Sequence, residues 1–134
     1  MPGEIDLNKL LQNMEPKLNE GEFAFCTVAS FQQASALEPL CMFQEDEGMT
    51  VILPKQKADK ASLPYPGVYS WITLTVHSSL DAVGLTAAVS KALTEANISC
   101  NVVAAYYHDH IFVPVKDTKG AMDVLKNLSK KELV

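Results

Sequence analysis

Cysteine is scarce in this chain of 134 residues, and it does not occur in the patterns that bind metals or cross-link small folds. The three cysteines, Cys26, Cys41 and Cys100, are an odd number, and no two of them have C-x-x-C spacing. Such usage is typical of reduced thiols in a cytoplasmic protein. We therefore expect neither a disulfide framework nor a zinc knuckle.

Long apolar runs and an excess of positive charge are also absent. No apolar segment approaches the roughly 20 residues that a membrane-spanning helix needs. The first residues, MPGE, lack the basic stretch and apolar core of a signal peptide. The formal net charge is −5, whereas a nucleic-acid partner would require a basic face. We therefore expect a cytoplasmic protein that binds neither membrane nor nucleic acid.

Apolar residues make up 48% of the chain, which is enough for a hydrophobic core in one domain or in two very small modules. Residues 69–76 alternate in strand fashion, with Ile72, Leu74 and Val76 on one face. Apolar residues then recur at three- and four-residue spacing from residue 85 to residue 96. This spacing predicts a helix that ends at Asn97, a residue that tolerates the left-handed conformation of a helix stop.

Two further strands and a helix complete the second half. Residues 98–107 and 111–115 predict a hairpin whose tip is the polar stretch 108–110. Asp117 is the expected N-cap of a final helix. The order β-α-β-β-α, with one more strand supplied from elsewhere, predicts an α+β fold with an antiparallel sheet and helices on one face.

The first half resembles a shortened copy of the second. Residues 49–61 and 109–121 each contain an apolar triplet that ends in proline, with Pro54 and Pro114 at an offset of 60. An amphipathic helix ending before Pro16 precedes the copy. The proline-rich stretch 62–67 then separates two predicted modules, which are residues 1–66, a truncated module with its N-terminal helix, and residues 67–134.

Residues 70–129 resemble an ACT domain, as found in the regulatory parts of aspartokinases and in amino-acid sensors. The matching features are the strand 72–76, the Val83-Gly84-Leu85 turn into a helix, the "EANIS" join and the "HDHIFVP" hairpin. The resemblance implies ferredoxin-like βαββαβ modules in tandem. It also implies a non-enzymatic regulatory homodimer that needs no cofactor and binds an amino-acid-like ligand at a module or subunit interface.

The resemblance further implies where this ligand would bind. Its carboxylate would rest on free backbone N–H groups where the first helix begins, because a helix N-terminus carries partial positive charge. Asp109 would meet a cationic group of the ligand. The residues carried over are the loop Asp81, Val83, Gly84 and Leu85, and the facing edge Asn97, Ile98 and Asn101.

Other interpretations of the same residues stay open. Asp81 could cap the helix, and Gly84 could serve packing alone. The stretch His108-Asp109-His110, with His77, could form a metal or catalytic site, because alternate residues of a strand project to one face. The chain could also be a purely structural dimerisation module.

Overall fold

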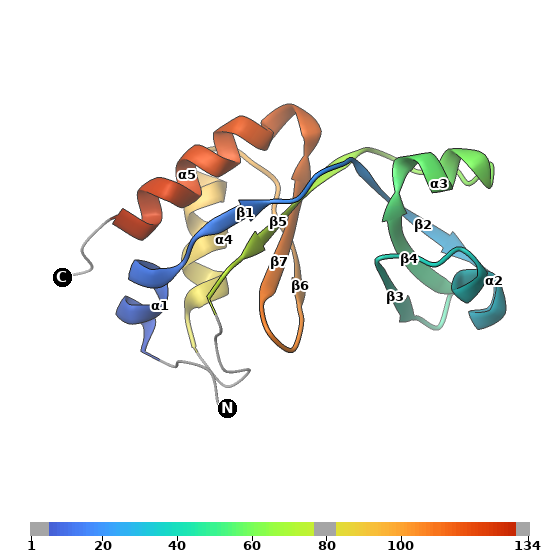
Figure 1. Ribbon diagram of the computed structural model, residues 1–134, viewed down its shortest axis with the longest axis horizontal. Coiled ribbons are helices and arrows are strands. Elements are labelled where there is room, and N and C mark those ends of the chain that lie inside the picture. Colours follow the sequence, from blue (N-terminus) through green and yellow to red (C-terminus); the bar gives the residue numbers. More distant parts are fainter. Residues whose placement is uncertain (1–5, 77–82, 131–134) are drawn as a thin grey trace. The chain divides into compact units, whose positions relative to one another are not determined.

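The computed structural model describes residues 6–76 and 83–130 and divides into two compact units. Residues 1–20 and 70–134 form one, the split unit, and residues 21–69 form the other, the inserted unit. The chain passes from one to the other at residues 20–21 and again at residues 69–70. Figure 1 shows the elements of each unit along the chain.

The split unit contains a four-stranded sheet in the order β1-β5-β7-β6. The pairs β1–β5 and β6–β7 are antiparallel. Its elements are α1 (Leu7–Asn13), β1 (Pro16–Leu18), β5 (Tyr69–Leu74), α4 (Leu85–Glu95), β6 (Asn101–Ala104), β7 (Asp109–Pro114), a 3₁₀ turn η1 (Val115–Asp117) and α5 (Thr118–Lys130). The predicted order β-α-β-β-α is confirmed, and the additional strand is β1, which pairs with β5.

The core of the split unit lies between this sheet and the helices. The apolar stripes of α4 and α5 pack on one face of β5 and β7, as the three- and four-residue spacing predicted. The buried residues of this core include Leu10, Leu11, Met14, Ile72, Leu74, Val89, Leu93, Ile111, Val113, Ala121 and Leu125.

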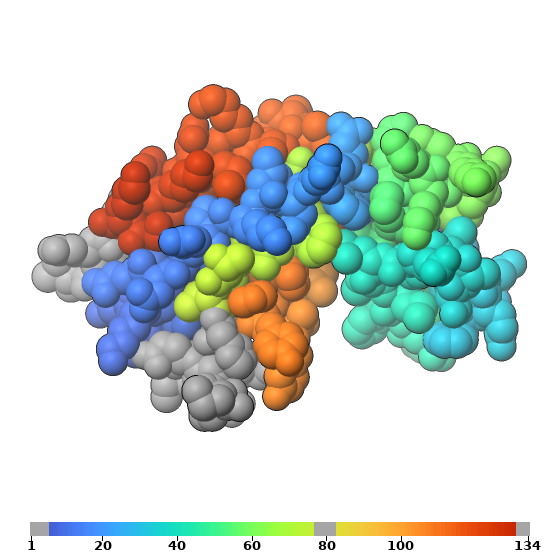
Figure 2. Space-filling model, viewed as in Figure 1, coloured from blue at the N-terminus to red at the C-terminus, as the bar shows by residue number. Residues whose placement is uncertain are grey.

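The N-terminal helix belongs to this core and not to the first-half strands. Leu10, Leu11 and Met14 are at most 1% exposed and pack among the residues of the second half. Figures 1 and 2 show α1 and β1 in blue beside α5 in red. The compact units therefore differ from the predicted division at residues 66 and 67. α1 packs against the core of the second half, and β1 pairs with β5, so both first-half elements have their contacts beyond residue 67.

The inserted unit has the same element order with a shorter helix. Its elements are β2 (Phe23–Val28), α2 (Phe31–Ala36), β3 (Cys41–Gln44), β4 (Met49–Pro54) and α3 (Lys55–Lys60), with the antiparallel strand order β3-β4-β2. Pro54 and Pro114 each end a strand before a helical turn, with φ −54° and ψ 137° and 139° respectively. These matching positions support the internal repeat, in which α2 has 6 residues and α4 has 11.

Several predicted boundaries are wrong. The tip of the second-half hairpin is residues 105–108 and not 108–110, because Asp109 and His110 already belong to β7. The second strand begins at Asn101 and not at residue 98, because the chain turn that ends α4 occupies the residues before it. Asp117 is not the N-cap of the last helix, since it lies within η1, and α5 begins at Thr118. Within residues 6–76 and 83–130, no helix combines the length and apolar character needed to cross a membrane.

Candidate functional site

The loop that leads into α4 is the first of the predicted ligand positions. Val83 is 83% exposed, and Gly84 is the N-cap of α4. Because glycine has no side chain, the cap residue itself supplies no acceptor to the first N–H groups of the helix. Leu85 is 3% exposed and belongs to the core, so only its backbone can face a ligand within the unit. Asp81 lies outside the described residues.

Gly84 has a structural reason to be glycine whether or not a ligand approaches it. Its φ is +103°, a conformation that side chains disfavour. A Cβ added at this position would lie 3.1 Å from Cδ2 of Leu7, on the N-terminal helix α1. The start of α4 therefore depends on a close approach of α1.

The second predicted set lies at the other end of α4. Asn97 has φ +61°, the N–H of Asn97 donates to the carbonyl of Thr94 at 2.9 Å, and that of Ile98 donates to the carbonyl of Leu93 at 2.9 Å. These bonds form a Schellman motif, so the predicted role of Asn97 as a left-handed helix stop is confirmed. The side chain of Ile98 is 7% exposed and belongs to the core.

Asn101 is also engaged within its own sheet. Its Nδ2 donates to the carbonyl of Phe112 at 3.2 Å, across the β6–β7 pair. A helix of 11 residues is about 16 Å long. Within one split unit, Asn97 is therefore separated from Gly84 by the length of α4.

Asp109 lies at the same end of the split unit as the start of α4. It opens β7 and shares its strand face with Ile111, which packs under the helices. The preceding residue, His108, places Nδ1 3.4 Å from the carbonyl of Val76, just after β5 ends. Figure 1 shows the β6–β7 hairpin and the beginning of α4 at one end of the sheet. The structure thus brings Asp109 to the same end as Val83 and Gly84.

The environment of Asp109 disfavours its charge. The residue is 9% exposed, and burial raises the pKa of its carboxyl above the ordinary value of 3.8, while His110 and His108 partly oppose the rise. A ligand cation beside Asp109 would lower the pKa of this carboxyl again, because an opposite charge stabilises a buried carboxylate.

Replacing Asp109 by asparagine is expected to raise the midpoint of thermal unfolding at pH 7. A raised pKa in the folded state means that the ionised form is penalised above that pKa and not below it. The gain over the wild type should therefore shrink as the pH falls toward 3.8. Thermal unfolding followed by circular dichroism at both pH values measures it.

The matched control is Asp123→Asn on α5, where the aspartate side chain is 58% exposed in an ion pair with Lys119. This change should leave the midpoint nearly unaltered. A lower midpoint for Asp109→Asn at pH 7 would show that the surroundings stabilise the carboxylate instead.

The contacts of His108 and His110 are not those of metal ligands. The rings of His108 and His110 are 6.4 Å apart between centroids. Nδ1 of His110 accepts a hydrogen bond from Nε1 of Trp71 at 3.0 Å, so this nitrogen is not available to a metal. No group of three or more potential ligands that could hold a metal ion occurs among residues 6–76 and 83–130, a range that does not include His77.

The polar contacts of His110 were not predicted from the sequence. They join β7 to Trp71 and Thr73 on β5, and through Thr73 to Asn19 just after β1. Strand alternation places Trp71 and Thr73 on one face, but the partner depends on β5 lying next to β7. That adjacency follows from tertiary structure.

Cys26 is buried and Cys100 is partly buried, and both have the properties of core residues. Burial raises the pKa of the Cys26 thiol, with a smaller contribution from Asp59, and burial also raises the pKa of the Cys100 thiol. Both shifts favour the neutral thiol, whereas a nucleophilic cysteine needs a lowered pKa.

Two hollows are lined by described residues alone, and none of the predicted ligand residues lines either of them. One, of about 320 Å³, lies between α4 and α5 and includes Ala92, Ala96 and Leu128. The other, of about 300 Å³, lies in the inserted unit between the start of α2 and residues 44–49. Because α2 follows β2 as α4 follows β5, this second hollow occupies the position equivalent to the start of α4.

Comparison with known proteins identifies relatives of the chain. Sequence models of the ACT domain match residues 2–81 and 68–127. A solved structure of a Vibrio cholerae protein of unknown function, described as a possible transport protein, is 46% identical, covers 92% of this chain and 96% of its own, and has a TM-score of 0.85. A search of curated proteins finds no match.

More distant structures share the fold alone. An Agrobacterium tumefaciens protein is 17% identical over 87% of this chain and 89% of its own, with a TM-score of 0.72. The regulatory subunit of aspartate kinase from Thermus thermophilus is 8% identical over 87% of this chain and 96% of its own, with a TM-score of 0.64.

Proposed function

Because the chain belongs to the ACT domain family, we propose that it is a non-enzymatic regulatory protein that binds a small amino acid. The observation that carries this proposal is the joint position of the α4 start and Asp109 at one end of the split unit. An amino acid carries a negative charge that suits the start of α4 and a positive charge that suits Asp109. Its carboxylate would accept from the first N–H groups of α4, and its ammonium or side-chain cation would meet Asp109.

A second module is part of the proposal. Asn97 and Asn101 lie at the far end of α4, about 16 Å from Gly84 by the length of the helix. They would contact the same ligand only if another module or another subunit supplied them. This separation favours a homodimer with the ligand at an interface.

The equivalent end of the inserted unit also supports the proposal. It carries a hollow of about 300 Å³ where α2 begins. The glutamates and aspartate at residues 45–47 line that hollow and give it negative charge, which would attract the cationic group of a ligand and not its carboxylate. The repeat thus places a concave, polar surface at the same end of the second module.

Titration of the purified chain with each of the twenty amino acids tests the function. We expect one or a few of them to release heat in calorimetry and to raise the midpoint of thermal unfolding, since a ligand that binds the folded state stabilises it. The mass in solution should be twice the chain mass. A null response to all twenty would contradict the amino-acid proposal and leave a structural dimerisation module.

The same titration with variants locates the site. Asp109→Asn should weaken binding of the active amino acid by about tenfold or more, because a charge-assisted contact is lost. Asp123→Asn should bind like the wild type, since this residue lies on the outer side of α5 in a surface ion pair. Equal affinities for both variants would place the ligand elsewhere.

A further inference from the structure

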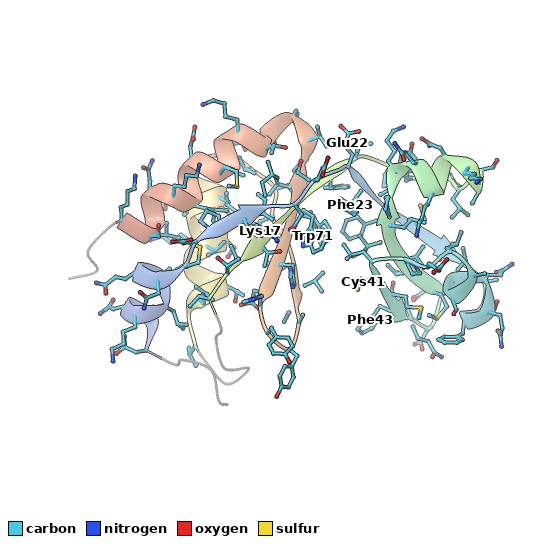
Figure 3. The ribbon with its side chains drawn as sticks, viewed as in Figure 1. Lys17, Glu22, Phe23, Cys41, Phe43 and Trp71 are labelled. Carbon is cyan, nitrogen blue, oxygen red and sulfur yellow. The ribbon has the colours of Figure 1, made fainter. Side chains whose placement is uncertain are left out.

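Three strand side chains of the split unit, and one from the residue just after β1, meet on the sheet face opposite α4 and α5. Nδ2 of Asn19 donates to Oγ1 of Thr73 at 2.9 Å. Oγ1 of Thr73 lies 3.1 Å from Nδ1 of His110, to which Nε1 of Trp71 donates at 3.0 Å. We call Asn19, Trp71, Thr73 and His110 the histidine clamp. Figure 3 labels Trp71 on β5 and, on β1, Lys17.

These contacts fix the protonation state of His110. An indole nitrogen is a donor only, so Nδ1 of His110 must be unprotonated and its ring proton must lie on Nε2. The Thr73 hydroxyl accepts from Asn19 and can donate its own hydrogen to the same Nδ1. The indole bond therefore requires an unprotonated Nδ1, whereas the Thr73 hydroxyl could also accept from a protonated one. A proton on Nδ1 would face the indole N–H and break the contact.

The clamp lies beside both places where the chain leaves the split unit. Asn19 and Trp71 flank the crossings at residues 20–21 and 69–70. They are also joined to each other, because the N–H of Asn19 donates to the carbonyl of Trp71 at 2.9 Å and Nδ2 donates to it at 3.3 Å. β5 is paired with β7 in the sheet, and His110 adds a side-chain link from both crossing segments to β7.

We propose that the histidine clamp is a proton-sensitive latch on the two chain crossings, which opens when His110 takes up a proton. Opening breaks the side-chain contact between Trp71 and His110, while the backbone pairing of β5 with β7 remains. The inference does not depend on the start of α4 or on Asp109, so it stands whether or not an amino acid binds there.

The charged groups around His110 set the direction of the titration. On β7 they are His108 and Asp109, and on β1 Lys17 pairs with Thr73 and so shares the face. The residues facing His110 from β5 and β6 are Trp71, Thr73 and Val103, which do not titrate in this range. Burial lowers the pKa of His110 below its ordinary value of 6.5, His108 adds to the shift, and Asp109 opposes it. The latch is therefore closed at neutral pH and opens below 6.5.

The single tryptophan makes the test direct. Trp71 is the one tryptophan of the chain, so a ¹H–¹⁵N spectrum of the full chain contains one indole resonance. Between about pH 8 and about pH 5, we expect this resonance to move along a titration curve with its midpoint below 6.5. The side-chain amide of Asn19 should follow the same curve. Hydrogen-exchange protection of the Asn19 backbone amide, corrected for intrinsic rate, should fall about tenfold.

Two variants separate the histidines. His110→Gln keeps an acceptor for the indole and cannot titrate, so its indole resonance should stay in place across the pH range. His108→Asn should keep the titration with a somewhat higher midpoint, since a like charge is removed. An indole resonance that does not move in the wild type, or that moves equally in His110→Gln, overturns the proposal. Should His110→Gln not fold, imidazole ¹⁵N shifts of the wild type decide, because a proton on Nδ1 at pH 7.5 also overturns it.

Discussion

Replacing Leu10 by alanine is expected to lower the free energy of unfolding by about 3 kcal/mol. Leu10 lies on α1, is fully buried, and packs in the core of the split unit with residues of β5, α4 and α5. Removing its isopropyl group leaves a cavity that the surrounding helices and sheet can fill only in part. Urea unfolding followed by circular dichroism measures the loss as a lower midpoint with an unchanged slope.

Leu18 provides a matched control for this experiment. It lies on β1, only a few residues further along the chain, and is 45% exposed. Leu18→Ala removes the same atoms from a site that water already reaches, so we expect a change within about 0.5 kcal/mol. Equal losses in the two variants would show that α1 does not contribute to the second-half core.

The second large effect is expected for Gly84→Ala, which should cost about 2 kcal/mol of folding free energy. Part of the cost is the backbone, because φ at this position is +103°. The remainder is contact, because the new Cβ would lie 3.1 Å from Cδ2 of Leu7. Adding Leu7→Ala to Gly84→Ala should relieve the contact part only, and the interaction energy of the double-mutant cycle measures it.

Gly67→Ala is the matched control. A Cβ there would meet only ordinary contacts of 3.6 Å or more with the Tyr69 side chain, and its φ lies outside the left-handed range. We expect this variant to be as stable as the wild type or slightly more stable, since alanine restricts the unfolded chain. If Gly84→Ala were equally stable but bound the amino acid weakly, the ligand would be what requires glycine at this position.

Local patterns predicted much of the fold. The alternation of residues 69–76, the apolar spacing of residues 85–96 and the repeated proline after a strand each depend on neighbouring residues alone. The side chain of Asn97 likewise predicted its own left-handed turn. Such features are decided within a few residues of the chain, so the sequence contains them directly.

Long-range partners were not accessible in the same way. The apolar face of α1 indicates that the helix needs a core but does not identify which one, and β1 has three residues, too few for a periodic signal. The contact between Trp71 and His110 depends on the neighbouring positions of β5 and β7, which are 39 residues apart in sequence at this contact. The family resemblance predicted one ligand site that contains both Gly84 and Asn97. The two residues lie at opposite ends of α4, so one split unit cannot supply both to the same ligand.

The double passage of the chain between its units also determines the order of events during synthesis. β1 leaves the ribosome before β5, its partner strand, and the whole inserted unit is translated between them. Residues 21–69 can therefore fold while the apolar face of α1 is still exposed to solvent. Folding of the split unit must bring β1 and β5 together across the inserted residues before the apolar face of α1 is buried. Closing such a long loop is slow and costs conformational entropy. Nascent chains stalled before β5 emerges are thus the ones most exposed to aggregation.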